Sequence, residues 1–200
     1  MESDVLDASS ENYLKRQVVE VSHRCGAQGW CPGTLGNISV VGPDLTVNIK
    51  RSGADLSRLK LEDVLTLDVE GNVVGGEGKP SIETNLHLGI YKIRNEVRAI
   101  FHIHPPFATA YAVASKKIPM VTEAAKLVLV DVPLLSHASP GSIELAEIVK
   151  DCFEDSRVKA ALLEEHGIVA VGDSLESTYQ TVALVEDTAK IALLSKLVKL

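Results

Sequence analysis

The chain has 200 residues, of which 46% are hydrophobic and 24% are charged, and its formal net charge at pH 7 is −7. This composition excludes a largely disordered or collagen-like chain, and the length suits one domain over residues 1–200 with a flexible N-terminus over residues 1–10. The acidic balance, without a run of lysine or arginine, argues against nucleic acid and acidic membranes as partners.

The first four residues lack the basic flank and apolar stretch of a signal peptide. No uncharged run reaches the roughly 20 residues that a membrane helix needs. Cys25, Cys31 and Cys152 are odd in number and lack a metal-type spacing, which fits reduced thiols with a structural role. We therefore predict a cytoplasmic protein.

The first half of the chain is predicted to form one helix and two hairpins. Apolar residues at intervals of four, three and four predict an amphipathic helix over residues 11–28 that is stopped by Gly29: Leu14, Val18, Val21 and Cys25. Short β-branched runs on either side of turn residues predict the hairpins, residues 38–41 with 45–49 and residues 64–69 with 73–74.

The second half alternates helices and strands. Ser81 is the predicted N-cap of a helix that ends near Asn95, and Asp173 with Glu176 is predicted to form the capping box of a terminal helix. Between them we predict strands at 98–104, 128–134, 160–163 and 168–171, and helices at 107–115 and 142–153. Because several strands lie in hairpins, we expect an α/β domain with a mainly antiparallel or mixed sheet covered by helices, rather than a doubly wound parallel fold.

Three histidines are candidate metal ligands. His102 and His104 stand two residues apart in a predicted strand, so both imidazoles point to one face and can bind one ion. The alternative is that one is buried and the other exposed. His166 lies at a break between two predicted strands, where a side chain can point out from the sheet edge, although a turn histidine can also be merely solvated.

Glu83 offers an oxygen ligand, although acidic residues also favour the first turn of a helix for electrostatic reasons. Three imidazoles and one carboxylate suit zinc or a similar first-row ion better than calcium or magnesium. Three histidines with one exchangeable position are typical of a catalytic rather than a structural zinc site.

Small residues at predicted turns and helix starts can hold a phosphate through backbone N–H groups and hydroxyls. These residues are Gly36, Asn37, Ser52, Gly53 and Ser81. The same dipeptides are common turn sequences, so each is a weak indication by itself. There is no Walker loop and no Gly-x-Gly-x-x-Gly, so nucleotide binding has no support.

These segments occur together in the order and spacing of a known family: Gly36-Asn37-Ile38-Ser39, Ser52-Gly53, Lys79-Pro80-Ser81-Ile82-Glu83, His102-Ile103-His104 and Glu165-His166-Gly167. From about residue 11 to 195 the chain resembles the class II aldolase and adducin family, most closely the L-fuculose-1-phosphate aldolases.

The resemblance implies a three-layer α/β/α domain and a homotetramer with active sites at subunit boundaries. It also implies one Zn²⁺ per subunit, bound by His102, His104 and His166. Glu83 matches the family's carboxylate, which is a zinc ligand in the empty site and a proton acceptor when substrate displaces it. The positions that bind the substrate phosphate carry over to Gly36, Asn37, Ser52, Gly53 and Ser81.

The chain departs from the fuculose-type pattern at three places. Ile82 replaces a serine, so one phosphate hydroxyl is missing. Glu123 stands where that aldolase carries an acid-catalytic tyrosine, and the alternative is that Glu123 merely begins a short helix. The chain ends at Leu200 without a tyrosine-bearing tail, so any further acid is expected to come from elsewhere.

The resemblance thus predicts reversible retro-aldol cleavage of a ketose 1-phosphate to dihydroxyacetone phosphate and a small aldehyde. Glu83 is expected to move the proton at the hydroxymethyl carbon, and Glu123 the proton at the aldehyde oxygen. One alternative is a methylthioribulose-1-phosphate dehydratase, which Glu123 favours. Others are a phosphopentulose 4-epimerase, which normally has aspartate at the position of Glu83, and a non-catalytic adducin-like scaffold, which predicts no bound metal.

Overall fold

The computed structural model describes residues 11–198, and the predicted flexible segment 1–10 lies outside them. The strands are β1 (Asn37–Val41), β2 (Val47–Lys50), β3 (Val64–Leu67), β4 (Val73–Gly75), β5 (Ala99–Ile103), β6 (Leu134–Leu135), β7 (Ala160–Leu163) and β8 (Gly167–Gly172). The helices are α1 (Glu11–Ala27), α2 (Thr84–Ile93), α3 (Pro106–Val113), α4 (Glu123–Val128), α5 (Ile143–Phe153) and α6 (Leu175–Leu197).

The eight strands form one sheet in the order β4-β3-β2-β1-β5-β8-β7-β6. Neighbouring strands are antiparallel, except for the parallel pair β6 and β7. Both predicted hairpins are present, since β1 pairs with β2 and β3 with β4. The prediction of a mixed, mainly antiparallel sheet is therefore confirmed.

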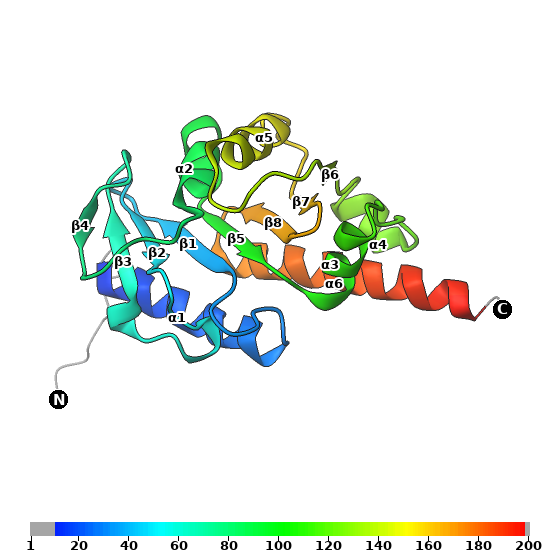
Figure 1. The fold of residues 1–200 in the computed structure, drawn as a ribbon, viewed down its shortest axis with the longest axis horizontal. Coiled ribbons are helices and arrows are strands. Elements are labelled where there is room, and N and C mark those ends of the chain that lie inside the picture. The colour runs from blue at the N-terminus through cyan, green and yellow to red at the C-terminus, as the bar shows by residue number, and fades with distance from the viewer. Residues whose placement is uncertain (1–10, 199–200) are drawn as a thin grey trace.

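Helices cover both faces of this sheet (Figure 1). On one face lie α2 and α5, and on the other lie α1, α3 and α6. Successive side chains of β5 pack against the helices on opposite faces of the sheet, because side chains alternate along a strand. Phe101 and Ile103 pack in the core beneath α1 and α6, whereas Ile100 packs beneath α2 and α5. The three-layer prediction is confirmed, and His102 faces the α2 layer.

Helix α1 buries the predicted apolar stripe. Val18, Val21 and Cys25 are buried in the core, and Leu14 packs against it. The helix ends at Ala27, and Gly29 follows with a φ of +74° while the Trp30 N–H donates to the Cys25 carbonyl at 3.1 Å. This left-handed glycine termination leads the chain directly into residues 29–36, which border the site described below.

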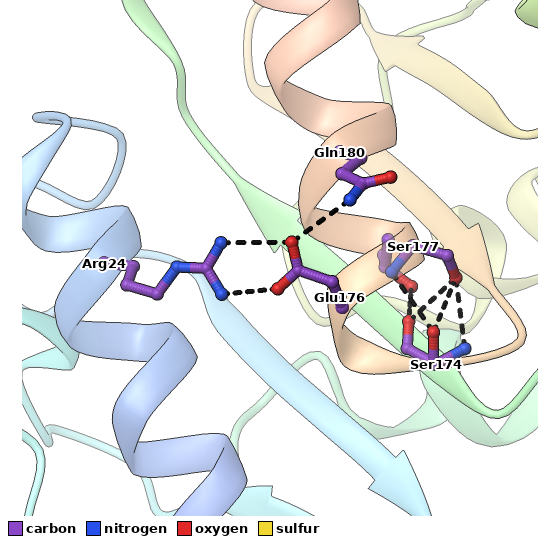
Figure 2. Close-up of polar contacts among 6 residues, drawn as sticks. Arg24, Ser174, Glu176, Ser177 and Gln180 are labelled. Carbon is purple, nitrogen blue, oxygen red and sulfur yellow. Dashed lines mark hydrogen bonds and ion pairs between the residues drawn. The ribbon is translucent and has the colours of Figure 1, made fainter.

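The N-terminal cap of α6 differs from the prediction. Ser174, not Asp173, is the N-cap, and its hydroxyl accepts from the Ser177 N–H while the Ser177 hydroxyl accepts from the Ser174 N–H (Figure 2). Glu176 instead forms an ion pair with Arg24 of α1 at 2.5 Å, and Gln180 donates to the same carboxylate. The carboxylate of Glu176, which the local spacing predicted to be part of the cap, therefore pairs with Arg24 of α1 instead.

The predicted strand over residues 128–134 is wrong. The Thr122 hydroxyl caps α4 by accepting from the Ala125 N–H at 3.2 Å, and the helix continues to Val128. Val130 then adopts a φ of +62°, and only Leu134–Leu135 pair with β7. The predicted strand does not form because Val128 belongs to the capped helix α4 and the left-handed conformation of Val130 interrupts the residues that follow.

No helix within residues 11–198 is both long and apolar enough to cross a membrane.

Candidate functional site

The predicted site residues gather around one cavity of about 900 Å³. It lies where the start of β1, the end of β5 and the start of β8 meet the loop after β2 and the segment before α2. All predicted site residues except Glu123 line it: Gly36, Asn37, Ser52, Gly53, Ser81, Glu83, His102, His104 and His166.

The three histidines form a compact group at this cavity. One ligating atom from each of His102, His104 and His166 lies within 4.8 Å of the others. The His102 Nδ1–H group can donate to the Ile168 carbonyl at 3.0 Å, which fixes the ring and leaves Nε2 for a ligand. Glu83 is not part of this group, so within residues 11–198 the compact donor set contains imidazoles only.

Sheet pairing brings the histidines to one place. His102 in β5 lies opposite Asn37 of β1 and Val169 of β8, and the His104 N–H donates to the Trp30 carbonyl at 2.9 Å. A residue larger than glycine would not fit at position 167, because its Cβ would lie 2.4 Å from His104 Cδ2 and 2.7 Å from the Ile103 carbonyl oxygen. The first residue of β8 thus makes room for the imidazole of His104.

Burial keeps these imidazoles neutral. It lowers the pKa of His102 well below the ordinary value and that of His104 to about 4, and it also lowers the pKa of His166. Nδ1 of His104 and Nδ1 of His166 are buried without a hydrogen-bond partner in the described chain. Because neutral nitrogens that converge without competing partners are the donors that zinc and related ions prefer, the residues present fit a metal centre.

Hydrogen-bond donors also line the cavity. Arg51 bridges to Pro80, and the Ser52 N–H donates to the Lys79 carbonyl at 2.8 Å, which joins the loop after β2 to the segment before α2. The backbone N–H of Ser52 is therefore already used, and only the Ser52 hydroxyl can donate to a ligand in the cavity. Asn37 Nδ2 donates to Ser81 Oγ at 3.1 Å. Such a concentration of amide and hydroxyl donors favours an anionic ligand.

Ser81 is not the N-cap of α2, in contrast to the prediction. The helix begins at Thr84 with Glu83 in the N-cap position, and the Thr84 N–H donates to the Ser81 backbone carbonyl at 3.1 Å. Because the Ser81 hydroxyl does not cap the helix, it can serve the cavity instead.

Glu83 is a buried carboxylate on the cavity wall. Its Oε1 accepts from the Gly141 N–H at 2.9 Å. Burial raises the pKa of Glu83, and the hydrogen bond from Gly141 opposes this shift. A carboxyl group whose pKa is raised toward neutrality suits a residue that gives and takes protons.

Sequence reasoning missed Lys50, a cation that lines the same cavity. Its side chain at the end of β2 is buried, and Nζ donates to the carbonyls of Thr34 at 2.6 Å and Ala54 at 2.7 Å. Burial lowers the pKa of Lys50 to about 8. An ammonium has three N–H donors, so one remains for a ligand. The available signal was a charged residue directly after the predicted strand 45–49 and directly before Arg51 and Ser52.

Glu165 also lines the cavity, although the sequence indicated it only as a member of the motif around His166. Its backbone φ is +59°, a left-handed conformation that is uncommon for a residue other than glycine. Such conformations concentrate at functional sites.

Glu123 does not reach this cavity within one chain. It is the first residue of α4, its side chain is 83% exposed, and it pairs with Lys126 Nζ at 2.6 Å. The expectation that Glu123 begins a short helix is therefore met, and any part it has in the cavity requires a neighbouring subunit.

Comparisons with known proteins identify the family of this chain. The family model described as Class II Aldolase and Adducin N-terminal domain matches residues 16–193. An L-fuculose phosphate aldolase from Methanocaldococcus jannaschii is 34% identical over 92% of this chain and 98% of its own. A 5-deoxy-D-ribulose 1-phosphate aldolase from Bacillus thuringiensis serovar kurstaki is 29% identical over 88% of this chain and 83% of its own.

A solved structure of an L-fuculose 1-phosphate aldolase superimposes with a TM-score of 0.87. The match covers 95% of this chain and 89% of the other, with 31% sequence identity.

Proposed function

Since this chain belongs to the class II aldolase and adducin family, we propose that it is a zinc-dependent aldolase acting on a phosphorylated ketose. The reaction would be reversible cleavage of a ketose 1-phosphate, similar to L-fuculose 1-phosphate, into dihydroxyacetone phosphate and a small aldehyde. The observation that carries the proposal is one cavity lined both by three neutral imidazoles and by amide, hydroxyl and ammonium donors.

The metal would be held by His102, His104 and His166, with Glu83 as a further ligand in the absence of substrate. A bound zinc ion supplies a Lewis acid that polarises the ketose carbonyl.

The substrate phosphate would be bound by Gly36, Asn37, Ser52, Gly53 and Ser81. Lys50 adds the positive charge that this set lacks, because its third N–H is not used by Thr34 or Ala54.

The two carboxyl groups would move the protons. When the C3–C4 bond breaks, the C4 hydroxyl proton passes to the carboxylate of Glu123 and C4 becomes the aldehyde carbon. The electron pair of the broken bond remains with the fragment that contains C3. Glu83 then gives its proton to C3, which completes dihydroxyacetone phosphate. The raised pKa of Glu83 suits this step, since a carboxyl group must hold a proton near neutrality in order to donate it.

A homotetramer would bring Glu123 to the site. Large apolar side chains are exposed around this residue and near the end of α6: Val121, Leu127, Val128, Val130, Leu197 and Val198. Exposed apolar groups of this kind are typical of protein interfaces. An interface at α4 would let Glu123 enter the cavity of a neighbouring subunit.

Dehydration of methylthioribulose 1-phosphate is the second proposal, because Glu123 replaces the tyrosine of the fuculose-type enzymes. To separate the reactions, zinc-loaded protein is incubated with dihydroxyacetone phosphate and a panel of short aldehydes, and separately with methylthioribulose 1-phosphate. We expect new ketose 1-phosphates by mass spectrometry in the first mixture. Loss of water from methylthioribulose 1-phosphate, without condensation in the first mixture, would replace the aldolase proposal.

A further inference from the structure

A chain of buried polar side chains runs from the core to the cavity wall. His87 of α2 is fully buried, its Nδ1 lies 2.6 Å from Ser39 Oγ, and its Nε2 contacts Asn37 Oδ1. Ser39 Oγ in turn lies 2.8 Å from the Tyr91 hydroxyl. At the other end, Asn37 Nδ2 donates to Ser81 Oγ. His87 does not line the cavity but joins it to the core.

With the Asn37 amide oriented as in the structure, the donors and acceptors of these linked side chains have one consistent direction. Asn37 Oδ1 can only accept, so His87 must carry its proton on Nε2 and accept on Nδ1. The Ser39 hydroxyl must then donate to His87, and it accepts from the Tyr91 hydroxyl at 2.8 Å. That contact is much shorter than the 3.5 Å from the Tyr91 hydroxyl to the Arg98 carbonyl, so the Tyr91 hydroxyl donates to Ser39 Oγ rather than to Arg98.

The same direction extends into the cavity. Ser81 Oγ accepts from Asn37 Nδ2 at 3.1 Å and from the Glu83 N–H at 3.4 Å. With two donors directed at this oxygen, the Ser81 hydroxyl proton is free to point to a ligand, and the second N–H of Asn37 is free as well. Each member of the chain therefore donates toward the cavity.

We propose that His87 is a positioning residue that fixes the amide of Asn37 with its nitrogen toward the cavity, so that Asn37 and Ser81 both present donors to an anionic group. The inference rests on the proposed function, in which that group is the substrate phosphate. If the imidazole carried its proton on Nδ1, the Asn37 amide would turn over and present an acceptor, which repels an anion. Complete burial favours a neutral ring, since it lowers the pKa of His87 to about 3.

The test measures the Kd of dihydroxyacetone phosphate for zinc-loaded protein by calorimetry. His87→Leu removes both ring hydrogen bonds at similar volume and is expected to raise Kd about tenfold, the scale of one hydrogen bond to a charged group. His87→Gln, which keeps an N–H donor for Asn37, is expected to recover part of this loss. Asn37→Ala is expected to raise Kd, and His87→Leu added to Asn37→Ala is expected to change it less than about twofold, because His87 acts through Asn37.

Tyr91→Phe is the matched control, since it alters the same buried cluster without touching Asn37. An increase in Kd as large as that of His87→Leu would assign the loss to damaged packing and overturn the inference. The inference also fails if His87→Leu leaves Kd unchanged while Asn37→Ala weakens binding, or if its full effect persists in the Asn37→Ala background. An unchanged Kd in Asn37→Ala would instead show that the proposed phosphate site is wrong.

The tautomer gives a second measurement that does not depend on a stable variant. Ring nitrogen chemical shifts of ¹⁵N-labelled wild-type protein report which nitrogen of His87 carries the proton. We expect protonation at Nε2, and a proton at Nδ1 would overturn the inference.

Discussion

Burial changes the pKa values of individual residues at the site. The same loss of water that keeps the three clustered imidazoles uncharged raises the pKa of Glu83 and lowers that of Lys50 to about 8. Desolvation disfavours whichever form is charged, so it acts on acids and bases in opposite directions. The cavity thereby holds neutral nitrogen donors, a carboxyl group suited to proton transfer and an ammonium that can still be charged at pH 7.

His104→Ala is expected to remove most of the zinc while the fold persists, because two remaining imidazoles bind the ion weakly. His23→Ala is the control, since His23 is exposed, does not line the cavity and has a ring hydrogen bond to the Leu59 carbonyl. Metal per subunit is measured by elemental analysis after dialysis. Full occupancy in His104→Ala would reject the ligand assignment.

Lys50→Met is expected to raise the KM for the phosphorylated substrate by about tenfold or more, the scale of a lost hydrogen bond to a charged group. Steady-state kinetics of zinc-loaded protein measure the effect. Lys79→Met is the matched control, because Lys79 is exposed and does not line the cavity. An equal KM in the two variants would argue that Lys50 serves only the Thr34 and Ala54 carbonyls.

Pairing of secondary-structure elements sets the distances between these residues. β5 lies between β1 and β8, so Asn37, His102 and Val169 stand side by side although they are far apart in sequence. The histidine turn between β7 and β8 comes to the same edge because β8 runs antiparallel to β5. The residues proposed to bind the metal and those proposed to bind the phosphate are thus brought together by two antiparallel pairings.

Gly167→Ala tests how tightly this edge is packed. The added Cβ would meet the ring of His104 and the Ile103 carbonyl, so the imidazole must shift and zinc affinity is expected to fall about tenfold or more. Gly89→Ala in α2 is the control, because its Cβ would meet only ordinary contacts from 3.7 Å outward. It is expected to keep the metal and to stabilise the helix by up to about 1 kcal/mol. Competition with a zinc chelator measures the zinc affinity of each variant. Equal affinities of Gly167→Ala and Gly89→Ala would show that the His104 ring can shift without weakening the bound metal.

The proposed role of Glu123 depends on the proposed assembly of subunits. Glu123→Gln is expected to lower kcat by about 100-fold if the residue exchanges a proton at the aldehyde oxygen. Proton exchange at the hydroxymethyl carbon of dihydroxyacetone phosphate should survive, because it needs only the metal and Glu83. Wild-type turnover would reject the catalytic role, and loss of both reactions would assign Glu123 to support of the metal site.

Mixing two inactive variants tests whether the site is shared between subunits. When Glu123→Gln and His104→Ala proteins are dissociated and reassembled together, roughly a quarter of the sites should combine an intact metal centre with an intact Glu123 from a neighbour. Activity should therefore reappear in the mixture and not in either protein reassembled alone. A mixture that stays inactive despite subunit exchange would contradict a shared site.

The buried histidines also link folding to pH in metal-free protein. The pKa values of His104 and His87 are lowered to about 4 and about 3, so below about pH 6.5 the unfolded chain binds protons that the folded chain does not. Stability should be greatest above that pH and fall as pH drops toward 4. Glu83 and Glu186 act in the opposite direction, since burial raises their pKa values.

This dependence is measured by chemical denaturation of chelator-treated protein at pH 7 and pH 5. The histidine contribution is isolated by comparison with His104→Ala, which should lose less stability between the two pH values than the wild type. Equal losses would show that His104 is not held neutral by the fold.

The sequence alone determined the helices and most of the strands, because their periods of about 3.6 and 2 residues are local properties. It also indicated the three histidines, Glu83 and the small polar residues of the cavity, since each lies in a recognisable short motif. Local patterns were insufficient where two local preferences competed, as in residues 128–134, where the cap from Thr122 prevailed over β propensity. The predicted cap at Asp173 is wrong because Ser174 and Ser177 form the capping box, while Glu176 pairs with Arg24 of another helix.

Only the tertiary structure decided the roles of residues whose neighbours are distant in sequence. Lys50 and His87 look like ordinary polar residues in a strand and a helix until packing places one beside the cavity and the other against Asn37. Glu123 stands at a position that the resemblance links to catalysis, yet within one chain it does not line the cavity and pairs with Lys126. Spacing along a chain fixes local geometry, whereas charge state, hydrogen-bond direction and access to a shared site depend on groups that only folding and assembly bring together.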